Sequence, residues 1–112
     1  MKETVVQRQL QAYNDKNIDA FMDCYSEDIK IYDFPDTLRL EGQEAMRTRY
    51  QTLFESYPDM IATVDKRIFH GNYAIDHEEI TGRLEGSTLK AVAIYEIKDD
   101  RITKVWFLKG NS

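Results

Sequence analysis

The sequence predicts an α+β fold: a cone-shaped barrel in which three N-terminal helices pack on a curved, mostly antiparallel sheet and enclose a pocket. Two observations lead to this prediction. Apolar residues in the first half recur mostly with the helical period of about 3.6, whereas in the second half they alternate with the strand period of 2. The turns between the later strands are short enough for hairpins, which favours a meander with the helices on one of its faces.

Three helices are predicted. The first covers residues 4–13, and the polar run 14–17 interrupts it. Asn17 is the expected N-cap of a second helix over residues 18–25, because a side-chain oxygen at this position can accept from a free backbone N–H of the first turn. The third and longest helix covers residues 43–57 and ends before a proline.

Strands account for most of the remainder. Residues 29–34 alternate and are rich in β-forming residues, and residues 38–40 form a short return strand after the break at Pro35. Four further strands are predicted over residues 60–69, 73–81, 89–97 and 102–108. A strongly twisted meander covered by helices tends to enclose a blind cavity.

Composition narrows the function. The 112 residues fit one domain, residues 1–112, and the net charge of −5 argues against nucleic acid and anionic membranes as partners. The lone cysteine, Cys24, allows no internal disulfide, and no apolar run reaches the length of a membrane span, so we expect a cytoplasmic protein. Two histidines and one cysteine form no metal-site spacing, and no phosphate-binding glycine loop occurs, so no metal and no cofactor are expected.

Four motifs in order carry a resemblance: VVQR at 5–8, IDAF at 18–21, YDFP at 32–35 and EGQEAMR at 41–47. In this order and spacing the chain resembles ketosteroid isomerase-like proteins of the nuclear transport factor 2-like superfamily, which includes the SnoaL-like polyketide cyclases. The resemblance implies a deep pocket for a small hydrophobic or amphipathic molecule, a homodimer packed through the sheet, and an activity like that of steroid delta-isomerase. The alternative is a non-catalytic domain for ligand binding or dimerisation.

Asp33 is the polar residue first expected inside the pocket. It matches the carboxylate at the end of the first strand that shuttles a proton between two carbons in ketosteroid isomerase, and burial would raise its pKa into a useful range. The structural alternative is an aspartate that caps the turn at Pro35. The family's two oxyanion donors, a tyrosine and a protonated aspartate, match Gln9 and Ala93, of which only Gln9 has a donor. The loss of one such donor typically costs about 10²–10³ in rate.

Further candidates follow from alternation and position. His77 and Glu79 share one face of strand 73–81 and would form a base with its neighbouring carboxylate if that face lines the pocket; otherwise both lie on an outer surface. Arg49 either pairs with Asp33 or Glu79, binds an anionic ligand, or is exposed on its helix.

Aromatic residues would line the pocket or form the core. Tyr25 belongs to this set, and Tyr95 and Phe107 share the expected inward register with Ala93.

Overall fold

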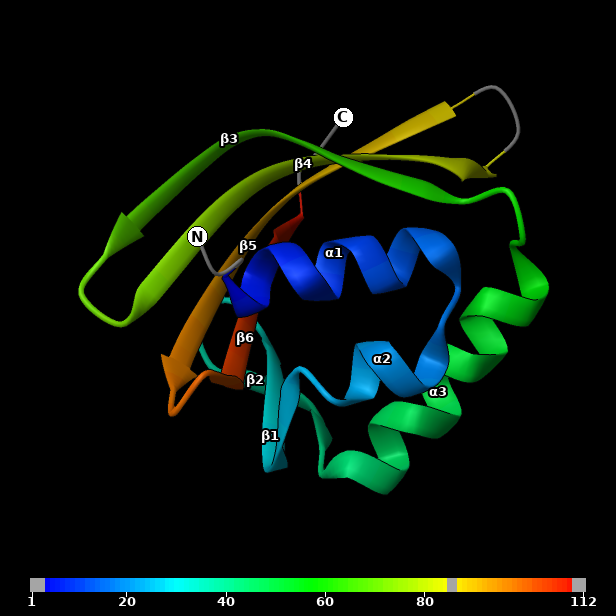
Figure 1. Ribbon diagram of the computed structural model, residues 1–112. Coiled ribbons are helices and arrows are strands. Elements are labelled where there is room, and N and C mark those ends of the chain that lie inside the picture. The colour runs from blue at the N-terminus through cyan, green and yellow to red at the C-terminus, as the bar shows by residue number, and fades with distance from the viewer. Residues whose placement is uncertain (1–3, 85–86, 110–112) are drawn as a thin grey trace.

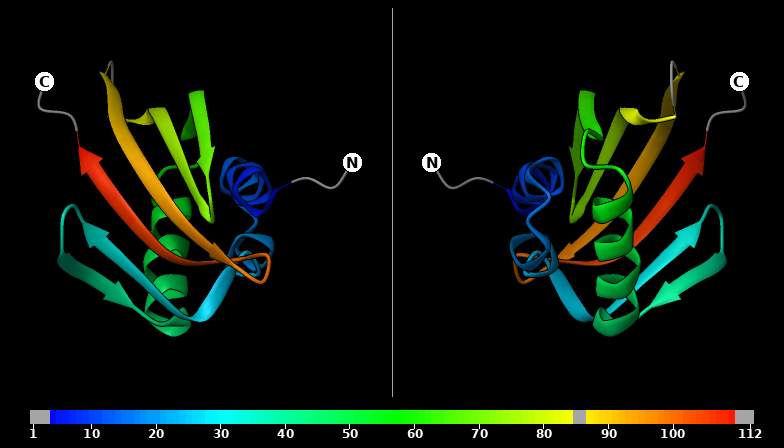
Figure 2. Two further views of the ribbon diagram at one scale, coloured as in Figure 1. Left: turned by 90° about the vertical axis from the view of Figure 1, so that its left-hand side faces the viewer. Right: turned by 90° about the vertical axis from the view of Figure 1, so that its right-hand side faces the viewer.

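Six strands form one curled sheet, and three helices cover its concave side (Figures 1 and 2). The computed structural model describes residues 4–84 and 87–109. The elements in chain order are α1 (Val5–Asp15), α2 (Ile18–Met22), β1 (Tyr25–Asp33), β2 (Thr37–Glu41), α3 (Gln43–Ser56), β3 (Ile61–His70), β4 (Tyr73–Leu84), β5 (Ser87–Lys98) and β6 (Arg101–Lys109). The predicted α+β architecture is confirmed, and the sheet curls without closing into a complete barrel.

The strand order is β2-β1-β6-β5-β4-β3. Strands β3 to β6 form the expected meander, with antiparallel pairs throughout, and β1 joins it by a parallel pairing with β6. The parallel pair brings the N-terminal part of the chain against its last strand. The sheet therefore presents one continuous concave surface from β2 to β3.

The helices begin and end close to the predicted positions, with one exception. Thr4 caps α1 by accepting from the backbone N–H of Gln7, and Asn17 caps α2 by accepting from Ala20 at 3.1 Å, as predicted. The second helix is shorter than expected, because Tyr25 already belongs to β1. The backbone N–H of Ile102 donates to the carbonyl of Cys24 at 2.9 Å, so the pairing with β6 ends the helix there.

Paired residues of neighbouring strands lie on the same face, so the register defines both faces of the sheet. One row across the concave face consists of buried residues. This inner row contains Ile31, Val105, Tyr95 and Ala74. A second row crosses all six strands on the convex face, where every member is at least partly exposed. This outer row contains Leu38, Tyr32, Trp106, Ile94, Ile75 and Ile68.

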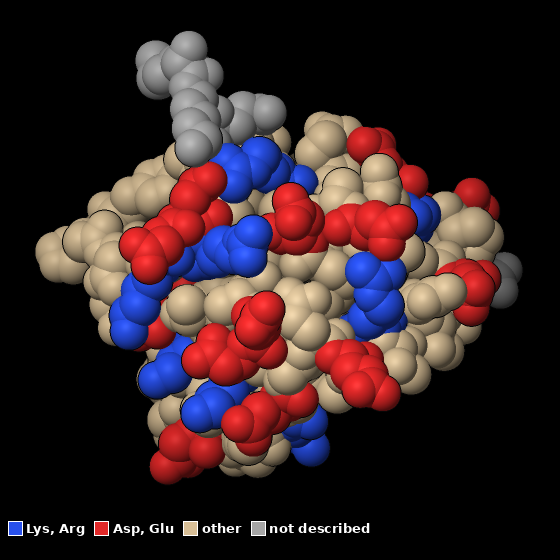
Figure 3. Space-filling model, turned by 60° about the horizontal axis from the view of Figure 1, so that its bottom comes forward, with Lys and Arg blue, Asp and Glu red and all other residues tan. Residues whose placement is uncertain are grey.

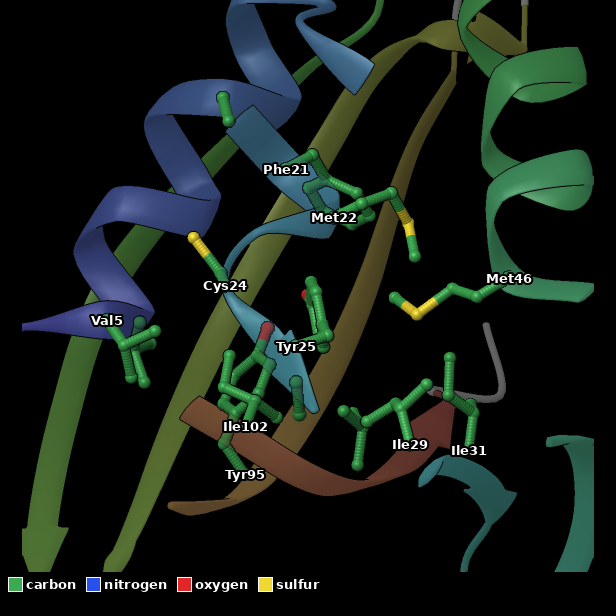
Figure 4. Close-up of a cluster of buried hydrophobic side chains, with 14 of the residues drawn as sticks. Val5, Phe21, Met22, Cys24, Tyr25, Ile29, Ile31, Met46, Tyr95 and Ile102 are labelled. Carbon is green, nitrogen blue, oxygen red and sulfur yellow. The ribbon is translucent and has the colours of Figure 1, made fainter. Parts of the chain in front are cut away.

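The core lies between the helices and the inner row, and Phe21 of α2 is at its centre (Figure 4). Its ring contacts Tyr25 and Tyr50 at centroid distances of 5.0 and 4.9 Å. It also contacts Tyr13 and Phe54, which meet each other edge to face at 5.4 Å. Aromatic side chains from all three helices thus pack against one another under the sheet.

On the face shown in Figure 3, acidic and basic side chains alternate without an extended area of one sign. Such mixing differs from the basic stripe of a typical nucleic-acid binder. Among the described residues, no helix is long and apolar enough to cross a lipid bilayer.

Candidate active site

A buried glutamate, Glu78, projects from β4 onto the concave face. Its backbone pairs with Ala91 of β5, and only 7% of the residue is exposed. The hydroxyl of Tyr95 donates to its Oε1 at 3.3 Å. A carboxyl group in this position is uncommon, because burial without a cation disfavours its charged form.

Tyr95 is the last link in a chain of hydrogen bonds that begins on another strand. The hydroxyl of Tyr25 donates to Oε1 of Gln9 at 2.9 Å, and Nε2 of Gln9 donates to the hydroxyl oxygen of Tyr95 at 3.3 Å. Every donor in the chain points towards Glu78, so the amide of Gln9 fixes the direction of both phenols. Burial raises the pKa of Tyr25 and Tyr95 well above the usual value, and both remain protonated donors.

Burial, reinforced by the negative charge of Asp76, raises the pKa of Glu78 to about 7. The hydrogen bond from Tyr95 and the positive charge of Arg67 act in the opposite direction, because both favour the carboxylate. A group with this pKa is present in both protonation states at neutral pH. It can therefore accept a proton and return it.

A buried ion pair lies beside Glu78 on the same face. Arg67 of β3 donates from Nε and Nη2 to the two carboxylate oxygens of Asp76 at 2.6 and 2.9 Å. Its Nη1 donates to Oε1 of Gln7 on α1 at 2.7 Å. The bidentate pair satisfies Asp76, which is fully buried, so Asp76 acts on Glu78 as a fixed negative charge.

Two polar atoms on this side remain available to a ligand. Oε2 of Glu78 and the hydroxyl of Tyr50 on α3 have no hydrogen-bond partner among the described residues. In the same part of the chain, every fully buried side-chain oxygen does have a partner. The Glu78 and Tyr50 oxygens therefore each keep at least slight contact with solvent, although both side chains are largely buried. Burial of the ring raises the pKa of Tyr50 to about 12, which keeps the hydroxyl a donor at neutral pH.

Five of the predicted site residues face the concave side. Gln9, Tyr25 and Tyr95 form the hydrogen-bond chain, although Gln9 donates to Tyr95 and is not free for a ligand. Ala93 is fully buried opposite Asp76, and Phe107 lies next to it in the register with part of its ring exposed.

Asp33 lies at the rim of the concave face. It pairs with Phe107 in the register, which places it on the inner side of β1, but 30% of its side chain is exposed. Nε of Arg39 on β2 donates to its Oδ2 at 2.5 Å. The register places Asp33 opposite Asp76, so three strand spacings of roughly 4.8 Å and two residues along β4 separate it from Glu78, about 16 Å in the plane of the sheet.

Of the two alternatives for His77 and Glu79, the structure shows the outer surface: both side chains lie on the convex face. Nδ1 of His77 is 2.6 Å from Oδ1 of Asp65, and Glu79 is 3.8 Å from Lys90. The cause is the register of β4 with β5, which pairs Ala74 with the buried Tyr95 and so turns the even-numbered residues of β4 inward.

Of the alternatives for Arg49, the structure shows the exposed helix position. In the described residues its guanidinium pairs with neither Asp33 nor Glu79, which are bound by Arg39 and Lys90. No group of three or more metal-ligating side chains occurs in the described ranges, and Cys24 is a buried thiol.

Glu78 was not predicted as a site residue. Ala93 and Tyr95 were expected to face inward, but the face of β4 that accompanies them depends on its register with β5, which alternation does not give. A hairpin centred between residues 82 and 87 pairs odd-numbered positions of β5 with even-numbered positions of β4. The inward register of Tyr95 therefore implies that Asp76 and Glu78 face inward too.

A separate groove lies on the surface near α2 and the start of α3. Its lining consists of Asp19, Met22, Asp23, Tyr25, Glu27, Gln43, Arg47 and Arg101. Four of its five charged groups pair with one another, since Arg47 bonds Asp19 at 2.8 Å and Arg101 is 4.0 Å from Asp23, and Glu27 is the fifth. The groove therefore presents fewer unpaired groups to a ligand than the concave face does.

Solved structures with a similar fold come from several bacteria. A cystatin-fold protein of Novosphingobium aromaticivorans aligns with a TM-score of 0.85 at 21% identity and covers 96% of this chain and 99% of its own. A putative polyketide cyclase of Sinorhizobium meliloti aligns at 0.80 with 20% identity, covering 93% of each chain. A putative ketosteroid isomerase of Kribbella flavida aligns at 0.82 with 18% identity, covering 96% of this chain and 76% of its own.

A search among curated proteins found no match. The sequence profile of the SnoaL-like domain, in contrast, matches residues 6–105, which is most of the chain. This match and the shared fold confirm the resemblance that the motifs suggested. The protein is a member of the SnoaL-like domain family.

Proposed function

We propose that this protein binds a small, mainly apolar molecule against the concave face of its sheet and transfers a proton on it, as an isomerase or cyclase does. The observation that supports this best is the state of Glu78. One of its oxygens is held by Tyr95, the other is open, and its pKa is about 7. A general acid or base is most effective when its pKa lies near the working pH.

The proposed step is the removal of a proton from a carbon next to a carbonyl group. Glu78 as carboxylate accepts the proton, the C–H electron pair moves into a C=C bond, and negative charge develops on the carbonyl oxygen. The free hydroxyl of Tyr50 is the donor we assign to that oxygen, because phenols remain protonated at neutral pH. Return of the proton to a different carbon completes an isomerisation without a net gain or loss of atoms.

The similar structures are consistent with this class of chemistry, since one is a putative polyketide cyclase and another is a putative ketosteroid isomerase. Asp33, the base that the family resemblance implies, is the second carboxylate on the inner side. Its side chain is 30% exposed and pairs with Arg39, so it lacks the burial that raises the pKa of Glu78. We therefore assign the base to Glu78 and retain Asp33 as the rival to be tested.

The experiment measures proton exchange in D₂O on a panel of apolar ketones that includes a 5-ene-3-ketosteroid. NMR follows the loss of protons from the carbons next to the carbonyl group. Wild type should catalyse exchange, and Glu78→Gln should reduce the rate at least about 10²-fold, as expected for a lost general base. Glu79→Gln, the adjacent outward-facing glutamate, is the matched control and should retain the rate. A loss with Asp33→Asn and none with Glu78→Gln would transfer the role to Asp33.

One observation favours the alternative of binding without catalysis. The amide of Gln9 is occupied by two tyrosines and Ala93 has no donor, so neither position can stabilise an enolate. Ligand binding by wild type and by Glu78→Gln, without exchange in either, would establish this alternative.

We also propose that two copies pair through the convex face. The outer row carries one apolar side chain on each strand, and its end members Ile68 and Leu38 are 59% and 47% exposed. Tyr32 stacks on Trp106 at 5.7 Å in the middle of the row. A two-fold interface uses the same patch on both copies, and a row across the whole sheet can pack against its own symmetry mate.

A further inference from the structure

Arginines in this protein are usually paired. The chain contains seven, and five have a carboxylate within 4.0 Å. Among the described residues, Arg49 and Arg83 have no such partner. Both affect the same side chain. Burial raises the pKa of Tyr50, and the positive charges of the two arginines lower it by a smaller amount. The two unpaired guanidinium groups thus lie near the open hydroxyl of the candidate site.

Arg83 is the better placed of the two. Both residues are exposed, but the guanidinium of Arg83 lies over the ring of Tyr57, with Cζ 5.8 Å from the ring centroid, whereas Arg49 has no ring contact among the described residues. Tyr57 follows the last turn of α3 and packs against the core. A guanidinium stacked on a ring keeps its edge free, so its N–H donors can still form a two-pronged contact with an anion.

The backbone fixes Arg83 in this place. Gly82 has φ +80, and a Cβ atom there would lie 2.4 Å from the carbonyl oxygen of Asp59. The end of β4 therefore runs in close contact with the segment that follows α3. This backbone contact brings the end of β4 close to Tyr57, over whose ring the guanidinium of Arg83 lies.

Tyr57 and Tyr50 are seven residues apart, two helical turns, so they share a face of α3 about 10 Å apart. Tyr50 in turn lies in the field of Glu78, which raises the pKa of its hydroxyl. Glu78, Tyr50 and Arg83 therefore follow one another from the interior to the rim. Along β4 the Cα atoms of Glu78 and Arg83 are roughly 16 Å apart.

We infer that the ligand of this site is an amphipathic anion: an apolar body whose carboxylate, sulfonate or similar group binds Arg83 at the rim while its far end meets Glu78. The inference rests on the proposed pocket and adds the charge of its ligand. Arg83 is then a specificity residue that does not touch the reacting atoms. Its position at the edge allows the anionic group to remain hydrated on one side while the apolar body is buried.

Two fluorescent probes that differ only in charge test this inference: 8-anilinonaphthalene-1-sulfonate and the neutral N-phenyl-1-naphthylamine. Wild type should bind the sulfonate more tightly. Arg83→Gln should weaken sulfonate binding about tenfold, the usual effect of losing one charge-assisted contact, and leave the neutral probe unchanged. Arg101→Gln removes the same charge from a distant, paired arginine and is the matched control.

Each outcome has a distinct meaning. If the neutral probe binds as tightly as the sulfonate, or if Arg83→Gln weakens both equally, the charge assignment is wrong while the pocket remains. An equal loss with Arg101→Gln also contradicts the assignment, because it shows a response to net charge alone. If neither probe binds to wild type, the pocket and the inference that rests on it are both refuted.

Discussion

The hydroxyl of Tyr95 donates a hydrogen bond to Oε1 of Glu78 at 3.3 Å, inside the concave face of the sheet. A phenol with a strongly raised pKa thereby stabilises the charged form of a carboxyl whose burial favours the neutral form. The opposing effects leave Glu78 close to half ionised at neutral pH. The hydrogen bond therefore controls how much carboxylate the site contains.

Tyr95→Phe removes that donor without changing the apolar volume of the side chain. We expect the pKa of Glu78 to rise above about 7, because burial and the charge of Asp76 then act with one fewer opposing contact. The measurement is a ¹³C NMR titration of the carboxyl groups, with the Glu78 signal assigned by its absence from Glu78→Gln. An unchanged or lower pKa would show that the 3.3 Å contact has no energetic effect.

Protein stability should depend on pH through the same residue. The pKa of Glu78 in the folded state, about 7, exceeds the ordinary value of 4.5, so between these pH values the folded state holds more protons than the unfolded one. Stability is therefore lost as pH rises from about 4.5 to about 7, by an amount on the order of 3 kcal/mol. Above pH 7 this contribution no longer changes.

Urea unfolding from pH 4.5 to 8 measures this effect. Glu78→Gln should lack this contribution, so its stability relative to wild type should increase across the interval. Glu79→Gln should follow wild type, because that carboxylate is exposed and outside the core. Parallel curves for wild type and Glu78→Gln would contradict the raised pKa.

Most of the fold could be predicted from the sequence, because period and turn signals are local. The helix that starts after Asn17 and the meander of four strands both follow from such signals. The parallel pairing of β1 with β6 could not be predicted in this way. It joins residues about 75 positions apart, such as Ile31 and Val105, and no local pattern encodes that contact.

The candidate site was harder to predict because it depends on which face of a strand turns inward. β4 carries carboxylates on both faces, Asp76 and Glu78 on one and Glu79 on the other, so alternation alone gives no preference. Only the pairing of Ala74 with the buried Tyr95 decides the face. The pairing of Asp33 with Arg39 likewise depends on the register between β1 and β2, which includes a bulge.

Arg67→Met should be strongly destabilising, by about 3–5 kcal/mol, because it leaves the carboxylate of Asp76 buried without a partner. Arg39→Met removes the pair with the more exposed Asp33 and should cost no more than about 1 kcal/mol. Chemical denaturation of both variants at pH 7 gives the comparison. An equal loss of unfolding free energy in both variants would mean that burial does not determine how much each ion pair stabilises the fold.

Gly82→Ala should also destabilise the fold, and Gly71→Ala is a close control. Both glycines have positive φ, +80 and +59, which costs an alanine roughly 1–2 kcal/mol. Only at Gly82 would the added Cβ also meet backbone, at 2.4 Å from the oxygen of Asp59, whereas nothing lies within 4 Å at Gly71. The melting temperature should therefore fall further for Gly82→Ala. Equal shifts would show that the end of β4 moves away from Asp59 at little cost.

Ile94→Lys tests the proposed pairing of two copies. Ile94 lies on β5 in the middle of the outer row, next to Trp106 in the register, and its side chain is partly exposed. A lysine there remains compatible with the folded monomer, but at the centre of a two-fold interface it would place two like charges together without water. We expect wild type to be a dimer at micromolar concentration by light scattering, and Ile94→Lys to be a monomer with an unchanged circular dichroism spectrum.

Thr52→Lys adds the same charge to the exposed side of α3 and should remain dimeric. A monomeric wild type, or a variant that still dimerises, would show that the outer row is not the interface.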